Sequence, residues 1–230
     1  MSLPERSARV QHLFTRIASR YDLMNRLMTG GQDGFWRREV IARAALQPGA
    51  CLLDLGAGTG DLAREALKQQ PTCQVTAADF TLAMMLAGRS NKGPTLTFAA
   101  ADALHLPFCD AHFDGLVSGF LLRNVVDLPR ALAEQFRVLK PGGRWVALDT
   151  TQPRSGLLTP LVQFYMHRVI PLAGRVLTGD GEAYRYLPET TQHFLSAEAL
   201  QEKLIEAGFR QTGFRRLNFG TIAIHWGVKP

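Results

Sequence analysis

The chain is poor in cysteine. Its 230 residues include three, Cys51, Cys73 and Cys109. An odd number at these spacings fits neither a disulfide framework nor a metal-binding knuckle. We therefore expect free thiols in a reducing compartment and no metal site.

Long apolar runs are also missing. No uninterrupted apolar stretch is long enough to cross a bilayer. The first six residues, Met-Ser-Leu-Pro-Glu-Arg, lack the apolar core of a secretory signal. These absences predict a cytoplasmic protein that is either soluble or bound peripherally to a membrane surface.

Basic residues outnumber acidic ones, but they do not gather into blocks. The net charge is +6, and no run of Lys and Arg is longer than two residues. A positive charge of this size favours acidic partners such as nucleic acid, anionic lipid or a phosphorylated ligand. Because aromatic residues do not alternate with the basic ones, the sequence predicts no nucleic-acid partner.

The composition is otherwise that of a globular domain. Hydrophobic residues make up 46% of the chain and charged residues 20%. A chain of this length buries a sizeable core without disulfides or metal. We expect one domain over 1–230, with a helical cap at 1–47, a ligand-binding core at 48–153, and further helices with a closing β-hairpin at 154–230.

Strand and helix patterns alternate through the middle of the chain. Short apolar runs between turn residues predict strands, and longer runs with helical periodicity predict helices. This alternation predicts an α/β fold with a mostly parallel sheet covered by helices on both faces. Strands are expected at 51–55, 73–78, 95–101, 113–120 and 145–148, helices at 8–46, 61–68, 82–89, 128–139 and 196–207, and a hairpin at 209–219 and 221–228.

A glycine-rich turn follows the first predicted strand. Gly56, Gly58 and Gly60 lie within the segment Asp54–Asp61, directly before a helix. Glycine permits positive φ and a close approach of ligand to backbone, and the helix N-terminus offers N–H groups. The G-x-G-x-G spacing is one residue shorter than the dinucleotide pattern. The turn suits a nucleoside with an amino-acid tail, although alone it does not separate the nucleotide ligands.

Acidic residues end the next two strands. Asp79 lies where a ribose-binding acid is expected, although it could instead cap the following helix. Asp102, beside Ala103, could accept a hydrogen bond from an adenine amino group. The apolar walls of that ring site could come from Phe80, Met84 and Leu104. Ordinary core packing is an equal explanation for the methionine.

The end of the fourth predicted strand carries further polar groups. In open α/β sheets, ligands bind beyond the carboxyl ends of the strands. Gly119 and Phe120 should therefore approach a bound nucleoside, and Arg123 with Asn124 should lie beside the reacting centre. The alternative for Arg123 is a helix cap or an ion pair with an acid such as Asp127, and spacing alone does not decide between them.

Together these motifs resemble the ubiquinone/menaquinone-biosynthesis C-methyltransferase family (UbiE/MenG type), almost from end to end. The most specific elements are Tyr21-Asp-Leu-Met-Asn25, Leu122-Arg-Asn124 and Tyr184-Arg-Tyr-Leu187. The glycine turn and Leu139-Lys-Pro-Gly-Gly143 are shared by many class I methyltransferases. The resemblance implies a Rossmann-like sheet of seven strands whose last strand is antiparallel.

The resemblance also implies a reaction. S-adenosylmethionine would be the cofactor, and a prenylated quinol would be methylated at a ring carbon, most simply demethylmenaquinol or the corresponding benzoquinol of ubiquinone synthesis. The catalytic residues would be Arg123 and Asn124, facing the acceptor. The expected cofactor site comprises Tyr21, Asp54, Gly56, Gly58, Thr59, Gly60, Asp79, Phe80, Asp102, Ala103 and Gly119.

The proton that leaves the quinol needs a route. Because a guanidinium stays protonated, Arg123 would stabilise the developing phenolate or orient a water rather than act as a simple base. His193 is an alternative acid–base group, although a surface or packed histidine is the plainer interpretation.

Three departures from the family pattern concern the acceptor. Leu121 stands where the family has a small glycine, Gln32–Phe35 replaces a basic pair, and Asp149-Thr-Thr-Gln-Pro153 replaces Glu-Phe-Ser/Thr-Lys-Pro. The main alternative is therefore a methyltransferase for another small molecule, followed by a non-catalytic protein that binds the donor.

One apolar stretch could contact a membrane or a partner protein. Residues 157–165 carry an apolar face, with Arg154, Arg168 and Arg175 nearby. Such a stretch can dock on anionic lipid, where a prenylated quinol resides. A helix packed over the active site, or against a second copy in a homodimer, explains the same pattern.

Overall fold

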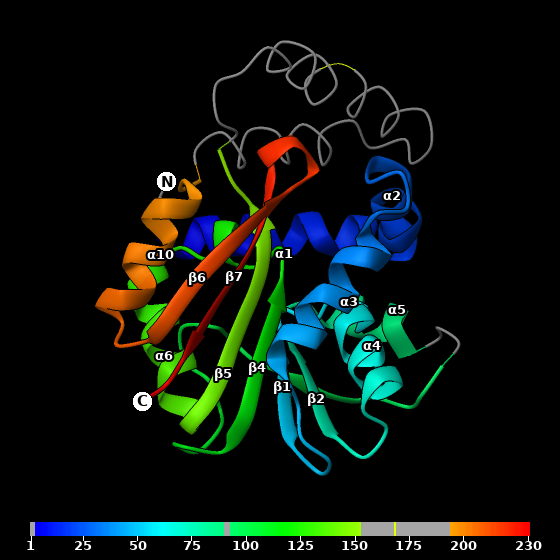
Figure 1. The fold of residues 1–230 in the computed structure, drawn as a ribbon. Helices are drawn as coiled ribbons and strands as arrows, with labels where there is room; N and C mark the ends of the chain where they lie inside the picture. Colours follow the sequence, from blue (N-terminus) through cyan, green and yellow to red (C-terminus); the bar gives the residue numbers. More distant parts are fainter. Residues whose placement is uncertain (1–2, 90–92, 153–167, 169–193) are drawn as a thin grey trace.

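The computed structural model describes residues 3–89, 93–152, 168 and 194–230. The predicted helical stretch at 157–177, apart from residue 168, and His193 lie outside these residues. The described chain forms one seven-stranded sheet flanked by helices (Figure 1).

The strands form a sheet in the order β3-β2-β1-β4-β5-β7-β6. The first five strands pair in parallel, and β7 runs antiparallel between β5 and β6. This confirms the predicted Rossmann-like sheet with an antiparallel last strand. The strands are β1 (Cys51–Leu55), β2 (Gln74–Asp79), β3 (Thr97–Ala100), β4 (Phe113–Gly119), β5 (Leu139–Thr150), β6 (Arg210–Leu217) and β7 (Ile222–Val228).

The helices alternate with the strands as the periodicity predicts. Short 3-10 turns η1 (Ala18–Arg20), η2 (Leu122–Asn124) and η4 (Asn218–Gly220) complete the described elements. The helices are α1 (Leu3–Ile17), α2 (Tyr21–Met28), α3 (Asp33–Ala44), α4 (Asp61–Gln69), α5 (Leu82–Arg89), α6 (Leu128–Val138) and α10 (Ala197–Glu206).

Apolar residues on both faces of the strands build two cores. Successive residues of a strand point to opposite faces, so Leu53 and Leu116 enter one core while Leu52 and Val117 enter the other. The first core packs against α6 and α10, and the second against α3 and α4. Figure 1 shows these helix pairs on opposite sides of the sheet.

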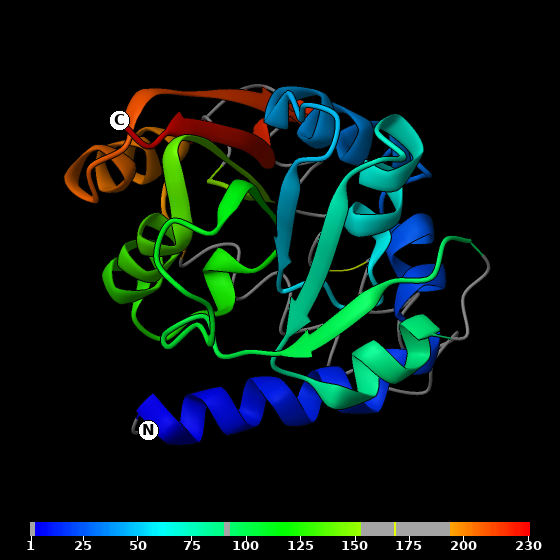
Figure 2. The ribbon, with the colours of Figure 1, turned by 90° about the horizontal axis from the view of Figure 1, so that it is seen from below.

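The N-terminal helices cover the carboxyl ends of the strands. Helix α1 lies alongside α5, as the view from below shows (Figure 2). Ile17 and Met24 are buried in a small cluster with Phe14 and Tyr21. Of the helices in the predicted cap, α1 and α2 form this cover, whereas α3 packs against one face of the sheet in the second core.

The predicted start of the fifth strand was wrong. The fifth strand was expected at 145–148, after a glycine turn that ends the preceding helix, but β5 already begins at Leu139. Leu139 pairs with Phe113, and regular pairing resumes only at Gly115 with Arg144. The Lys-Pro-Gly-Gly segment is thus an irregularity within the strand. Its proline and glycines are equally typical of a loop, so the sequence alone does not show that the strand has already begun.

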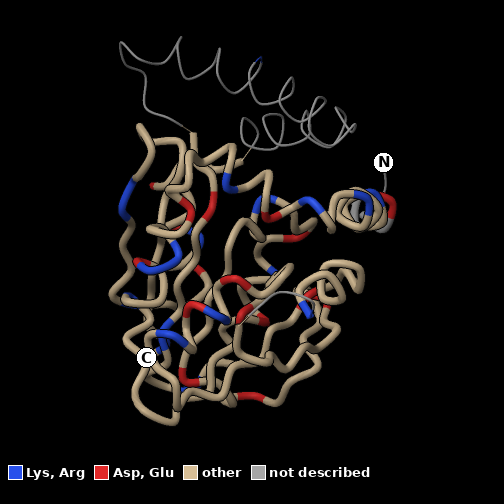
Figure 3. Tube along the Cα trace, turned by 90° about the vertical axis from the view of Figure 1, so that its right-hand side faces the viewer, with Lys and Arg blue, Asp and Glu red and all other residues tan. Residues whose placement is uncertain are grey.

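Charge is spread over the described chain. Lys and Arg are interspersed with Asp and Glu along the trace (Figure 3), so the positive excess is not gathered into one stripe there. None of the described helices is long and apolar enough to cross a membrane.

Candidate functional site

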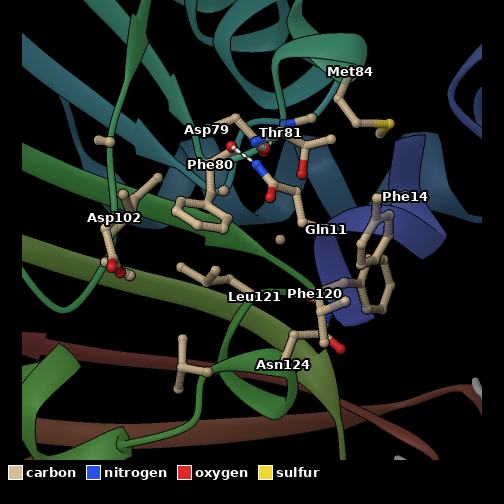
Figure 4. A pocket seen from close by; sticks show the side chains of 18 of the residues that line it. Gln11, Phe14, Asp79, Phe80, Thr81, Met84, Asp102, Phe120, Leu121 and Asn124 are labelled. Atoms are coloured by element: carbon tan, nitrogen blue, oxygen red, sulfur yellow. Dashed lines mark hydrogen bonds between the residues drawn. The ribbon is translucent and has the colours of Figure 1, made fainter. Parts of the chain in front are cut away.

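A pocket lies beyond the carboxyl ends of β1, β2 and β4 (Figure 4). Its wall includes Leu55, Asp79 and Gly119, which are the last residues of those strands. This is the position expected for a ligand in an open α/β sheet. Of the predicted site residues, the pocket brings together Tyr21, Gly56, Gly58, Asp79, Phe80, Asp102, Ala103, Gly119 and Asn124.

The glycine turn presents backbone to the pocket. The N–H groups of Gly56 and Ala57 donate to the Ala78 carbonyl at 2.8 and 3.0 Å, which ties the turn to β2. Gly56 has φ +68°, and a Cβ there would lie 2.9 Å from Leu121 Cδ1. The positive φ therefore favours glycine, and a Cβ there would also displace the Leu121 side chain. A Cβ on Gly58 would meet the Met84 methyl group at 3.1 Å.

Asp79 links the turn to the next helix. Its Oδ2 accepts a hydrogen bond from Gly58 N at 2.7 Å, and its Oδ1 accepts one from Thr81 N at 2.7 Å. Burial raises the pKa of this carboxyl, and these hydrogen bonds oppose the rise. Asp79 is thus a preorganised acceptor at the pocket, and it also satisfies N–H groups in the segment before α5.

Asp54 lies behind the turn and does not line the pocket. Its Oδ2 accepts from Ala63 N in the first turn of α4 at 2.9 Å, and its Oδ1 has no partner among the described residues. Burial raises its pKa to about 7. Because the side chain is 1% exposed, its direct role is to hold α4 against β1.

Thr59 and Gly60 also lie outside the pocket wall. Thr59 Oγ1 donates to Asp22 Oδ1 at 2.7 Å, which fastens α2 to the glycine turn. The Thr59 carbonyl accepts from Arg64 Nη1 at 2.6 Å, and Arg64 Nη2 donates to the Gly88 carbonyl. Buried Arg64 therefore joins the turn to the end of α5, where the helix dipole favours a cation.

The third strand supplies the far wall. Asp102 is exposed at the pocket, and its Oδ1 accepts from Leu104 N at 2.9 Å. Phe80, Met84 and Leu104 line the same pocket. An acceptor flanked by apolar side chains can hold a planar heterocycle with an amino group.

The turn after β4 is strained. Phe120 has φ +60°, which is unfavourable for a residue with a Cβ. Its N–H donates to the Leu148 carbonyl at 2.7 Å, which holds the turn to β5. Asn124 Nδ2 donates to the Phe120 carbonyl at 2.9 Å. Phe120, Leu121 and Asn124 all face the pocket (Figure 4).

Arg123 is buried and does not line the pocket. Its side chain is 5% exposed, and its Nη1 lies 2.6 Å from Asp149 Oδ1. The guanidinium also lies 4.9 Å from the centre of the Phe120 ring. Asp127, the acid considered as its partner, instead caps α6 by accepting from Arg130 N at 3.0 Å. Spacing did not identify Asp149, which is 26 residues away in the chain.

Helix α1 contributes a wall that the sequence did not predict. Val10, Gln11 and Phe14 line the pocket, and Gln11 Nε2 donates to the Phe80 carbonyl at 3.1 Å (Figure 4). The apolar periodicity of α1 indicated a helix but not what its face covers. The Tyr21 ring packs edge-on against the Phe14 ring, with 6.0 Å between the ring centres. Burial raises the pKa of the Tyr21 hydroxyl.

The pocket combines an acidic acceptor, glycine backbone in its wall and apolar side chains. Within the described part of the chain, no group of three His, Cys, Asp or Glu side chains is arranged to hold a metal ion. The set therefore fits an organic ligand with hydroxyl groups and a planar ring.

The fold itself is that of the class I methyltransferases. A solved structure of phosphoethanolamine N-methyltransferase 2 from Haemonchus contortus, in complex with S-adenosyl-L-methionine, aligns with a TM-score of 0.64 at 16% identity. The alignment covers 85% of this chain and 52% of that one. The chain belongs to the ubiE/COQ5 methyltransferase family, which it matches over residues 3–229.

Relatives in sequence agree with this assignment. The chain is 47% identical over 222 residues to a ubiquinone/menaquinone biosynthesis C-methyltransferase UbiE of Desulfotalea psychrophila, covering 96% of this chain and 90% of that protein. It is 42% identical over 223 residues to a demethylmenaquinone methyltransferase of Roseiflexus castenholzii, covering 96% and 93%. The resemblance inferred from the motifs is confirmed.

Proposed function

We propose that this protein transfers the methyl group of S-adenosylmethionine to a ring carbon of a prenylated quinol, with demethylmenaquinol as the first substrate to test. The observation that carries the proposal is the pocket at the carboxyl ends of β1, β2 and β4 in a chain of the ubiE/COQ5 methyltransferase family. The named activities of two relatives at 47% and 42% identity support the quinol.

The pocket fits the cofactor. Asp79 would accept hydrogen bonds from the ribose hydroxyls, and Asp102 with Leu104 would receive the adenine ring. The backbone at Gly56 and Gly58 leaves room for the methionine portion, which Tyr21 would cover. When bound, the cofactor supplies an electrophilic methyl group on a sulfonium. The distantly related structure with bound S-adenosyl-L-methionine supports this choice of ligand.

Asn124 and Arg123 would serve the acceptor. Asn124 lines the pocket and is the polar side chain of the η2 turn placed to contact a quinol oxygen. Arg123 lies beside it in the η2 turn, and its guanidinium, paired with Asp149, would favour the negative charge that develops on that oxygen. The apolar walls would favour the quinol ring over water, which would otherwise compete for the methyl group.

A second candidate is methylation of a different small acceptor. Leu121 favours this second candidate. Its side chain fills the space over Gly56, whereas the family has glycine at the position of Leu121. A residue of this size beside the reacting centre changes the room left for the acceptor ring.

We expect the protein to bind its substrate at the membrane surface, because a prenylated quinol partitions into lipid. The stretch first considered for docking, 157–165, lies outside the described residues. Co-sedimentation with liposomes that contain or lack anionic lipid tests the contact, and sedimentation velocity tests the homodimer.

The deciding experiment is a turnover assay. The protein is incubated with S-adenosylmethionine and either demethylmenaquinol, a demethylated benzoquinol, or a panel of phenols, and released S-adenosylhomocysteine is measured. We expect the quinols to be methylated at carbon. Methylation of another phenol alone would move the function to the second candidate, and donor binding without any turnover would indicate a binding protein.

A further inference from the structure

A buried carboxylate behind the pocket is held by the η2 turn. Asp149, near the end of β5, is 1% exposed. Its Oδ1 lies 2.6 Å from Arg123 Nη1, and its Oδ2 accepts from the backbone N–H of Arg123 at 3.3 Å. One carboxylate therefore binds both the side chain and the main chain of the same residue, which fixes the position of that residue against the sheet.

The turn that Asp149 fixes carries two walls of the pocket. The Arg123 guanidinium lies over the Phe120 ring, and Asn124 Nδ2 holds the Phe120 carbonyl. Phe120 and Asn124 line the pocket, whereas Arg123 and Asp149 do not. A displacement of Arg123 would consequently move both walls.

We propose that Asp149 is a positioning residue, which holds Arg123 and thereby sets Phe120 and Asn124 against the acceptor. Asp149 does not line the pocket, so its effect on the reaction passes through Arg123. The reaction that it serves is the one set out under Proposed function, and the inference rests on it to that extent.

The energetics favour this assignment over simple stabilisation of the fold. Removing two charges from water costs several kcal/mol per ion before they attract each other, and an apolar pair of similar volume is often equally stable. A pair whose side chains are 5% and 1% exposed is thus a poor device for stability alone. Arg123 Nε is buried without a hydrogen-bond partner among the described residues, so the position of the guanidinium depends on its contacts with Asp149 and with the Phe120 ring.

A double-mutant cycle tests the route. Asp149→Asn is compared with Arg123→Gln and with the double variant, and kcat, KM and donor Kd are measured for each. We expect Asp149→Asn to lower kcat about 10- to 100-fold, the scale of a misplaced catalytic group, with donor Kd within about twofold. In the Arg123→Gln background the same change should lower kcat much less, because only the hydrogen bond to the main chain of residue 123 is then left to weaken.

The matched control is Asp127→Asn. This carboxylate lies close in sequence to the same turn, but its hydrogen bond goes to Arg130 N in α6 and not to Arg123. Asparagine is as good a helix cap as aspartate, so kcat should stay within about twofold. Asp149→Glu keeps the charge and should recover part of the kcat lost in Asp149→Asn. Where Asp149→Asn does not fold, the cycle is run with Asp149→Glu, whose smaller loss of kcat must also shrink in the Arg123→Gln background.

Hydrogen exchange gives a readout without turnover. Amide exchange in a peptide covering 120–126 should quicken in Asp149→Asn, while exchange in the β1 strand stays unchanged. Additive losses of kcat in the cycle, a shared loss of donor affinity, or unchanged exchange at 120–126 would each overturn the positioning role. A wild-type protein inactive on every quinol, with faster exchange in the variant, would overturn the proposed reaction but leave the positioning role standing.

Discussion

Helix α5 rests on the glycine turn through Gly88 and Thr59. A Cβ on Gly88 would lie 2.4 Å from the Thr59 carbonyl oxygen and 2.8 Å from its carbonyl carbon. Both are backbone atoms, so neither can rotate away. The closeness lets Arg64 bridge the two carbonyls and keeps Met84 beside Gly58 in the pocket.

Gly88→Ala should loosen the pocket. The added methyl group forces α5 away from the turn, which costs about 1–3 kcal/mol, typical of overpacking, and Tm should fall by roughly 2–10 °C. Donor affinity should fall as well. Gly34→Ala is the control, because its Cβ would meet only Arg38 Nη1 at 3.9 Å; there the helix propensity of alanine should leave Tm unchanged or slightly raised. Equal Tm values for the two variants would contradict the packing argument.

Asp79→Asn should weaken the binding of S-adenosylmethionine. Asparagine keeps one acceptor oxygen where the carboxylate uses two, at Gly58 N and Thr81 N, and it removes the charge offered to the ribose. Loss of a charge-assisted hydrogen bond corresponds to about 10- to 100-fold in Kd. Calorimetry measures it, with Asp110→Asn, whose side chain is 77% exposed, as the control. Wild-type affinity in Asp79→Asn would refute the ribose role.

Asp54→Asn should change how stability depends on pH. The folded state holds the Asp54 pKa at about 7, above its ordinary value of 3.8. Between these values the folded protein binds the extra proton, so wild-type stability falls as pH rises from about 4 to about 7 and then levels off. The variant lacks this ionisation, so its Tm relative to wild type should rise across that window. Parallel Tm curves would show that Asp54 does not titrate as its burial implies.

Glu134→Gln should show the opposite dependence. The hydrogen bond from Arg137 holds the Glu134 pKa near 2, and the carboxylate also accepts from Leu106 N at 2.8 Å. The stabilisation is present above pH 4.5 and is lost as pH falls towards 2. At pH 7 the variant should lose roughly 2–10 °C in Tm, a gap that closes in acid. Glu206→Gln, in an exposed pair with Lys203, should change Tm by about 1 °C.

Periodicity predicted the order of the elements well. The bounds of β1 and α5 match those expected, because turn residues and an apolar run mark both ends of each. Pairing between strands is not local information. The start of β5 at Leu139 depends on Phe113 across the sheet, and a propensity for turns at Pro141 and Gly142 cannot report it.

The site was predictable where it followed the strand ends. Gly56, Asp79 and Asn124 could be placed because Gly56 directly follows β1, Asp79 ends β2, and Asn124 lies in the turn after β4, and the carboxyl ends of all three strands face the pocket. Gln11 and Asp149, the partner of Arg123, could not be placed from the sequence, because they lie on a helix and a strand that are distant in the chain. Gly88 gave no signal either, since a helical glycine reveals its role only through what it touches.

Strand β7 comes last of the seven strands in chain order, but it lies inside the sheet and not at its edge. Strand β7 pairs with both β5 and β6, so β6 precedes it in the chain but joins the sheet only through it. During synthesis, β6 therefore has no partner until residues 222–228 have left the ribosome. A nascent chain that stalls before that point exposes two unpaired strand edges, one on β5 and one on β6, which are the features that invite aggregation and chaperone binding.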